Sequence, residues 1–228
     1  MRFFYIRHGE PIYNPDSLTE LGKKQAEALA RRFMNIGLDE VYSSTSHRAI
    51  QTAMPTCKAL GLDMTLLDFA YENYAWDQLS VKRGDKKLWL YQDSEMKQLL
   101  CEPSVREMRE NWMFHPELSK YHFEKGIERI YRECDLFFEN LGYQHIRYTG
   151  KYKVISHNEK KVAFFAHQGF GIAFISCLLD IPYPQISNHF DICHTGVTVI
   201  DFKEEKGYAI PKVLTFSSDS HLHAINNC

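Results

Sequence analysis

Four residues near the start of the chain, Arg7-His8-Gly9-Glu10, combine a cation, an imidazole, a residue without a side chain and a carboxylate. They follow the apolar run of residues 2–6, which is long enough for one buried strand. Arginine offers a planar fork that suits phosphate oxygens, histidine can act as nucleophile or proton carrier, and glycine lets a backbone N–H approach a ligand closely. Open α/β sheets place their chemistry beyond the carboxyl ends of their strands, so we expect a site here, although a lone histidine is more often structural.

A second arginine follows a second predicted strand, at residues 38–42. The hydroxyl cluster Ser43-Ser-Thr-Ser46 precedes Arg48 and is typical of a helix N-terminus, which is itself an anion site. A cation in the first helical turn is mildly unfavourable with the helix dipole. An anion bound between the helix and Arg48 would explain the arginine.

A second histidine, His167, follows the unbroken apolar run of residues 162–166. Such a run predicts a central strand that is buried on both faces. Gly169 and Gly171 then open a helix over residues 172–179. A strand, a histidine, a glycine-rich turn and a helix form an anion-binding geometry, which repeats that of the first stretch.

Together these stretches resemble the histidine phosphatase superfamily, also called the phosphoglycerate mutase-like superfamily. The helix beginning near Thr19 adds to the resemblance, because its sequence LTELGKKQA matches the L-T-x-x-G-x-x-Q-A of that family. The resemblance covers residues 1–76 and 121–216. It implies an α/β fold of three layers, in which helices flank a mostly parallel central sheet, with residues 1–228 forming one domain.

The resemblance also implies the residues of the site. The catalytic residues are His8, Glu72 and His167, and the phosphate-binding residues are Arg7, Arg48, Asn14 and His194. Asn14 could instead be a turn-forming residue. In the family, the loop before the strand at residues 197–202 closes the pocket with backbone N–H groups, a role that suits Thr195 and Gly196.

Glu72 follows a short strand at residues 64–67, where the family places the proton donor to the leaving group. The chain departs from the pattern here, because many relatives have a glycine four residues later and this chain has Trp76. Asp68 and Asp77 remain alternative acids. Partial burial against the neighbouring aromatic rings would raise the pKa of Glu72 toward the range of a general acid.

Residues 80–150 form the least defined part of the sequence. The segment is rich in aromatic residues and methionine, includes the polar stretch 82–87, and contains an amphipathic helix over residues 121–141. We expect an inserted helical cap or lid over the carboxyl edge of the sheet. A helical layer without ligand contact is the alternative. An aromatic cap indicates a substrate that is bulkier or flatter than glycerate.

Composition narrows the remaining classes. A net charge of −2 without a basic stripe argues against nucleic-acid binding, and no apolar segment is long enough for a membrane span. No signal peptide is expected, because the first strand starts at once, without a separate basic flank, apolar core and cleavage site. Six scattered cysteines are typical of reduced cytoplasmic thiols rather than of disulfides or zinc. The histidine pair His221 and His223 is expected in a solvated tail, so no metal site is predicted. The oligomeric state is left open.

The predicted reaction is metal-independent hydrolysis of a small-molecule phosphomonoester through a phosphohistidine on His8, by a histidine acid-type phosphatase without a cofactor. A mutase must keep water from the phosphohistidine, and nothing after Glu72 resembles the mutase pattern well, so the phosphatase is favoured. The alternatives are a phosphoglycerate mutase-type phosphotransferase and a binding module with little turnover.

Overall fold

A computed structural model of the chain describes residues 1–223 and is built on a six-stranded sheet with the order β14-β11-β1-β10-β4-β5. Its strands are β1 (Arg2–Arg7), β4 (Glu40–Ser44), β5 (Met64–Leu67), β10 (Lys161–Ala166), β11 (Val197–Asp201) and β14 (Lys212–Ser218). The strands β1, β10, β4 and β5 run parallel, whereas β11 is antiparallel to both of its neighbours. The sheet is therefore mostly parallel, as the sequence predicts.

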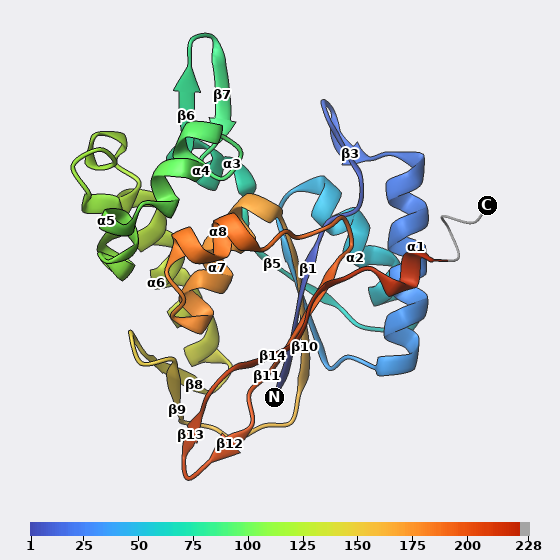
Figure 1. Ribbon diagram of the computed structural model, residues 1–228. Helices are drawn as coiled ribbons and strands as arrows, with labels where there is room; N and C mark the ends of the chain where they lie inside the picture. The colour runs from blue at the N-terminus through green and yellow to red at the C-terminus, as the bar shows by residue number, and fades with distance from the viewer. Residues whose placement is uncertain (224–228) are drawn as a thin grey trace.

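Helices cover both faces of this sheet (Figure 1). They are α1 (Glu20–Ile36), α2 (His47–Leu60), α3 (Glu72–Gln78), α4 (Ser94–Cys101), α5 (Pro103–Arg106), α6 (Glu124–Asn140), α7 (Gln168–Leu179) and α8 (Tyr183–His189), with 3₁₀ turns at Asp68–Ala70, Arg109–Phe114, Ser119–Tyr121 and Ser220–Leu222. Three smaller sheets comprise β2 (Pro11–Tyr13) with β3 (Asp16–Leu18), β6 (Ser80–Arg83) with β7 (Lys86–Trp89), and β8 (Tyr143–Ile146), β9 (Lys151–Val154), β12 (Glu204–Glu205) and β13 (Tyr208–Ala209).

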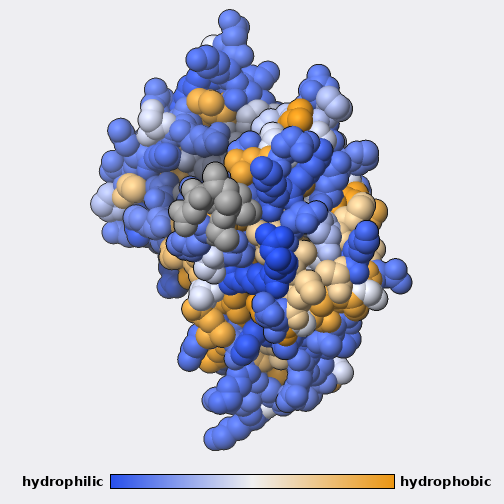
Figure 2. Space-filling model, turned by 90° about the vertical axis from the view of Figure 1, so that its right-hand side faces the viewer, coloured by the Kyte–Doolittle hydropathy of each residue, from blue (hydrophilic) through white to orange (hydrophobic). Residues whose placement is uncertain are grey.

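The two faces of β1 pack against different helical layers. Phe4 and Ile6 contact an apolar cluster that includes Leu29 and Phe33 of α1. Phe3 and Tyr5 point to the opposite face and join a larger cluster with α6 and α7. Because both faces are covered, this strand is apolar without alternation. The outer surface on the α1 side is mostly hydrophilic, with apolar patches between the polar groups (Figure 2).

The register of the sheet brings the ends of three strands together. Arg7 pairs with Ala166 between β1 and β10, and Phe165 pairs with Ser43 between β10 and β4. The residues that follow, His8 and His167, therefore leave the sheet side by side at its carboxyl edge.

The segment 80–150 does not form a single cap. In α6, the Phe137 ring stacks on Phe164 with centroids 5.4 Å apart, and the Phe138 ring packs edge-on against Phe3 at 5.2 Å. This helix thus belongs to the helical layer of the core rather than to a cap. The expected polar loop at 82–87 is a hairpin, β6–β7, which projects beside the carboxyl edge of the sheet (Figure 1). A lid function for this part stays a prediction.

Two polar segments are more ordered than the sequence indicates. His145 is buried, with Nδ1 2.8 Å from Asp135 Oδ1 and Nε2 3.1 Å from Asp180 Oδ2. Burial alone would lower the pKa of His145, but the hydrogen bonds to these carboxylates outweigh it and raise the pKa to about 11. His221, expected in a solvated tail, instead lies against the fold, with Nε2 3.0 Å from Thr195 Oγ1.

None of the helices described for residues 1–223 is long and apolar enough to cross a membrane.

Candidate active site

His8 lies at the carboxyl end of β1, where 1% of its surface is exposed. Its Nδ1 is 2.7 Å from the carbonyl oxygen of Gly9, and Arg48 Nε donates to its Nε2 at 3.2 Å. Because a guanidinium N–H can only donate, Nε2 must accept, so the ring proton is on Nδ1 and is donated to the Gly9 carbonyl. Burial lowers the pKa of His8 well below 6.5. The ring is therefore neutral and carries an electron pair on Nε2.

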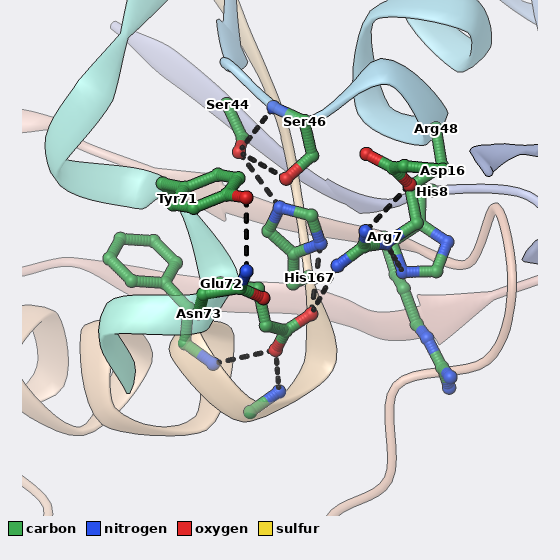
Figure 3. Close-up of polar contacts among 12 residues, drawn as sticks. Arg7, His8, Asp16, Ser44, Ser46, Arg48, Tyr71, Glu72, Asn73 and His167 are labelled. Carbon is green, nitrogen blue, oxygen red and sulfur yellow. Dashed lines mark hydrogen bonds and ion pairs between the residues drawn. The ribbon is translucent and has the colours of Figure 1, made fainter. Parts of the chain in front are cut away.

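Arg48 lies in the first turn of α2 and directs its guanidinium at three partners (Figure 3). Nε faces His8, Nη2 is 3.4 Å from Glu72 Oε2, and Nη1 is 2.7 Å from Asp16 Oδ1. The other oxygen of Asp16 accepts the backbone N–H of His47 at 2.8 Å. Asp16 therefore caps α2 and fixes the orientation of Arg48. The sequence analysis missed it because its only signal was a carboxylate in a loop.

Glu72 and His167 meet beside His8. The Nδ1 atom of His167 is 2.9 Å from Glu72 Oε2, and its Nε2 is 2.8 Å from Ser44 Oγ. The other Glu72 oxygen accepts the backbone N–H of Gly169 at 3.0 Å, at the start of α7. The His8 and His167 ring centroids are 5.1 Å apart. The structure thus joins these three residues with Arg48 in one buried cluster, while Asp68, an alternative acid, pairs with Tyr74 outside it.

The expected upward shift of the Glu72 pKa is wrong for the structure without a ligand. Burial alone would raise this pKa, but His167, His8 and Arg48 outweigh it and hold the pKa at about 2. His167 itself has a lowered pKa because it is fully buried, although Glu72 opposes the shift. Glu72 is consequently ionised here.

Close packing explains the glycines of the motifs. A Cβ on Gly9 would lie 2.7 Å from the carbonyl oxygen of Gly22, so the first loop and α1 can approach only without side chains. A Cβ on Gly169 would meet the Trp89 ring, and one on Gly171 would meet Tyr5. The glycines therefore let α7 begin directly behind Glu72.

Arg7 and His194 lie next to His8 but face away from Glu72. Arg7 Nη1 donates to the Ile192 carbonyl at 2.6 Å, and Figure 3 shows its side chain pointing away from Glu72 and His167. The His194 ring is 5.8 Å from the His8 ring. Within the described residues, neither the buried Arg7 Nε nor His194 Nε2 has a hydrogen-bond partner. Both are hydrogen-bonding groups without a partner beside His8, and their phosphate-binding role stays a prediction.

The structure places two parts of the predicted site loops away from the cluster. Asn14 is exposed at the tip of the β2–β3 hairpin and is not brought into the cluster, because Tyr13 pairs with Asp16 and leaves Asn14 in the two-residue turn. The backbone N–H groups of Thr195 and Gly196 are not free to close the pocket. They donate instead to the carbonyl oxygens of Arg7 and Cys193, at 3.0 and 2.9 Å.

A cleft of about 500 Å³ opens beside Arg48 and Glu72. Its other lining residues include four aromatic and two amide side chains: Tyr13, Tyr71, Trp76, Trp89, Asn73 and Gln92. Trp89 and Gln92 come from the start of the segment 80–150, so this part of the predicted cap does reach the cleft. The sequence shows that this segment is rich in aromatic residues, but it does not show that the fold brings them to this cleft.

Two groups of side chains in the described residues could hold a metal ion by composition and distance: His8 with Glu72 and His167, and Asp135 with His145 and Cys177. In the first group, the Arg48 cation already contacts both His8 and Glu72, which disfavours a second cation. In the second, His145 is held as an imidazolium between two carboxylates.

The structure thus gathers two histidines, an arginine and a glutamate at the carboxyl edge of a mostly parallel sheet. The model of the histidine phosphatase superfamily (branch 1) matches residues 3–97. Two curated proteins of Hydrogenobacter thermophilus that carry the name phosphoserine phosphatase are each 24% identical to this chain. One alignment covers 90% of this chain and 91% of the relative, the other 69% and 71%.

Two further similarities complete the comparison. A Yersinia pestis protein named "Probable phosphoglycerate mutase GpmB" is 37% identical over 73 residues, which is 28% of this chain and 34% of that protein. The crystal structure of phosphoserine phosphatase from Entamoeba histolytica in complex with 3-phosphoglyceric acid covers 97% of this chain and 98% of its own, with 20% identity and a TM-score of 0.62. The chain is therefore similar to the histidine phosphatase superfamily, through the family model over residues 3–97 and through relatives that are 24% identical over most of its length.

Proposed function

We propose that this protein is a metal-independent phosphomonoester hydrolase that works through a phosphohistidine on His8. The observation that carries the proposal is the tautomer of His8, whose Nδ1 proton is held by the Gly9 carbonyl while Nε2 faces Arg48. A neutral imidazole with its electron pair aimed at an arginine is prepared to attack a phosphorus atom whose oxygens that arginine binds.

In the first step, the Nε2 electron pair of His8 forms the N–P bond while the bond from phosphorus to the leaving oxygen breaks. Arg48 and His167 bind the equatorial oxygens, and Arg7 and His194 approach them from the other side of His8. Glu72 donates its proton to the leaving oxygen, which departs as the alcohol.

In the second step, Glu72, now a carboxylate, takes a proton from a water molecule as the water oxygen attacks the phosphohistidine. The N–P bond breaks, and inorganic phosphate and neutral His8 are restored. The free protein holds Glu72 ionised, so its proton must arrive with the substrate, which binds as the phosphate monoanion and passes the proton to Glu72. The dianion that this leaves between Arg48 and Glu72 neutralises the arginine and raises the carboxyl pKa, since like charges disfavour ionisation. After the second step, the proton on Glu72 leaves with the inorganic phosphate.

Hydrolysis is favoured over mutase chemistry by the extent of the similarities. The relatives named phosphoserine phosphatase align over most of the chain, whereas the mutase relative aligns over 73 residues. A binding module without turnover would not need His8 held as a neutral base. We also propose that the enzyme is of the acid type, because the role of Glu72 as a proton donor requires activity to fall as the pH rises. The cytoplasmic location stays a prediction.

The test is hydrolysis of p-nitrophenyl phosphate with and without EDTA. We expect turnover that EDTA does not reduce, because Arg48 supplies the positive charge that a metal would otherwise provide and the buried histidines supply ring nitrogens rather than charge. Loss of turnover in EDTA, with recovery on adding a divalent cation, would contradict the metal-independent mechanism. Absence of turnover together with interconversion of phosphoglycerates would favour the mutase.

A further inference from the structure

The cleft beyond Arg48 and Glu72 has the composition of a site for a cation. Among its lining residues, all of them in the described part of the chain, Asp16 is the only charged side chain apart from those two. No lysine or further arginine is present to receive a carboxylate of the leaving group. Four aromatic rings make up much of the wall, and the faces of such rings attract alkylammonium groups.

Two cationic side chains of the protein already make cation–π contacts with rings of this wall. Lys87 Nζ lies 5.2 Å from the centroid of the Trp76 ring, and the guanidinium carbon of Arg48 lies 5.5 Å from that of Tyr13. Lys87 is also paired with Asp77 at 2.7 Å, so its charge is balanced outside the cleft. Two of the four rings thus already take part in contacts of this type within the folded chain.

Asp16 keeps a carboxylate fixed at the cleft wall. One oxygen contacts Arg48 Nη1 and the other accepts the His47 N–H, and 30% of its side chain is exposed. This contact leaves the Nε and Nη2 edge of Arg48 for the phosphoryl group. A substrate phosphate would then lie near a second, permanent negative charge, and the repulsion is relieved when the leaving group itself carries a cation.

We propose that the substrate is a phosphomonoester whose alcohol bears an alkylammonium group, which lies against the aromatic wall and Asp16 while the phosphoryl group lies at His8. The inference rests on the proposed phosphatase function for the orientation of the phosphoryl group. The proposed substrate class differs from phosphorylated hydroxy acids. Their leaving group carries a carboxylate, which would lie against the Asp16 carboxylate without an unpaired cation among the lining residues to balance it.

The binding test uses His8→Ala protein, so that no turnover disturbs it, and three probes in isothermal titration calorimetry. These are choline phosphate, its neutral carbon isostere 3,3-dimethylbutyl phosphate, and 3-phosphoglycerate. We expect choline phosphate to bind about tenfold tighter than the isostere. One cation–π contact, together with partial pairing of the ammonium group with Asp16, gives a difference in affinity of this size. We expect 3-phosphoglycerate to bind more weakly than both. Equal affinity for the first two probes, or tighter binding of 3-phosphoglycerate, would overturn the inference.

Variants separate the cleft from general charge effects. Asp16→Asn should narrow the ratio of affinities for choline phosphate and its isostere, and Trp76→Leu should narrow it independently. Asp68→Asn, which removes a carboxylate that pairs with Tyr74 outside the cleft, should leave the ratio unchanged. A ratio that Asp68→Asn changes as much as the other two variants would contradict a role for the cleft.

The same probes in wild-type kinetics keep the two proposals distinct. Turnover of p-nitrophenyl phosphate without any preference for the cationic substrate would overturn the substrate class and leave the phosphatase standing. The expected binding order without turnover of any phosphomonoester would overturn the phosphatase and leave the ammonium site standing.

Discussion

Replacing His8 with alanine is expected to lower kcat for phosphomonoester hydrolysis by about 10⁴-fold or more, as loss of a covalent nucleophile does in other enzymes. The reason is that no other side chain in the cluster offers a neutral nitrogen aimed at the phosphoryl position. His167 is buried with its two ring nitrogens at Glu72 and Ser44. The fold should persist, because the alanine leaves the backbone N–H of residue 8 bonded to the Ala166 carbonyl and the Gly9 N–H bonded to Thr52. Steady-state hydrolysis and a circular dichroism melt of the same preparation measure both parts.

His194→Ala is the matched control for this variant. Its ring lies 5.8 Å from that of His8 but holds no contact with Arg48 or Glu72 in the described structure. Removal of one phosphate donor should raise KM more than it lowers kcat, with a total effect far smaller than that of His8→Ala. Equal losses in the two variants would contradict the assignment of His8 as the nucleophile.

Replacing Glu72 with glutamine should lower kcat for an alkyl phosphate by about 10²- to 10⁴-fold, the usual contribution of a general acid. The effect should be much smaller for p-nitrophenyl phosphate, whose leaving oxygen departs readily without a proton. Glutamine keeps the size of the side chain and can still accept the Gly169 N–H, so the difference between the two substrates reports proton donation. A loss of the same size for both substrates would indicate a positioning role instead.

The pH dependence of kcat gives a second test of Glu72 as the proton donor. The pKa of Glu72 is about 2 in the free protein, and in the proposed mechanism the bound phosphate raises it, so the carboxyl is protonated in the complex only below the raised pKa. The wild-type kcat should therefore fall as the pH rises through that value, and Glu72→Gln should lack this decline. Burial lowers the pKa of His8 well below 6.5, and the ring is neutral above its pKa, so His8 should contribute no decline as the pH rises. A wild-type kcat that rises with pH would contradict Glu72 as the acid.

The parts of the site that could be predicted from the sequence are those set by local rules. His8 and His167 each follow a buried strand directly, and Arg48 lies in the first turn of the helix after β4. Parallel pairing then places the ends of those strands side by side. Glu72 could be located for a similar reason, since it begins the helix after β5. In these cases, the residue type and its distance from an apolar run were sufficient.

The remaining features depend on chain paths that no local pattern specifies. Asn14 matches the family spacing, yet the β2–β3 hairpin turns it to solvent and brings Asp16 to Arg48 instead. Trp89 lies at the cleft because it ends the β6–β7 hairpin. The polar residues 82–87 gave no sign in the sequence that this hairpin would form. The downward shift of the Glu72 pKa required the positions of three cations or imidazoles around one carboxylate, which only the folded chain brings together.

The most direct test of the central claim is detection of the phosphoenzyme. Wild-type protein would be mixed with a phosphomonoester, quenched within the first turnover in alkali, where phosphohistidine is stable, and digested for mass spectrometry. We expect one added phosphoryl group on the peptide that contains His8, lost after brief acid treatment and absent in His8→Ala. Single-turnover hydrolysis at the full rate with no phosphoryl group on that peptide, or with the group on another residue, would contradict the account.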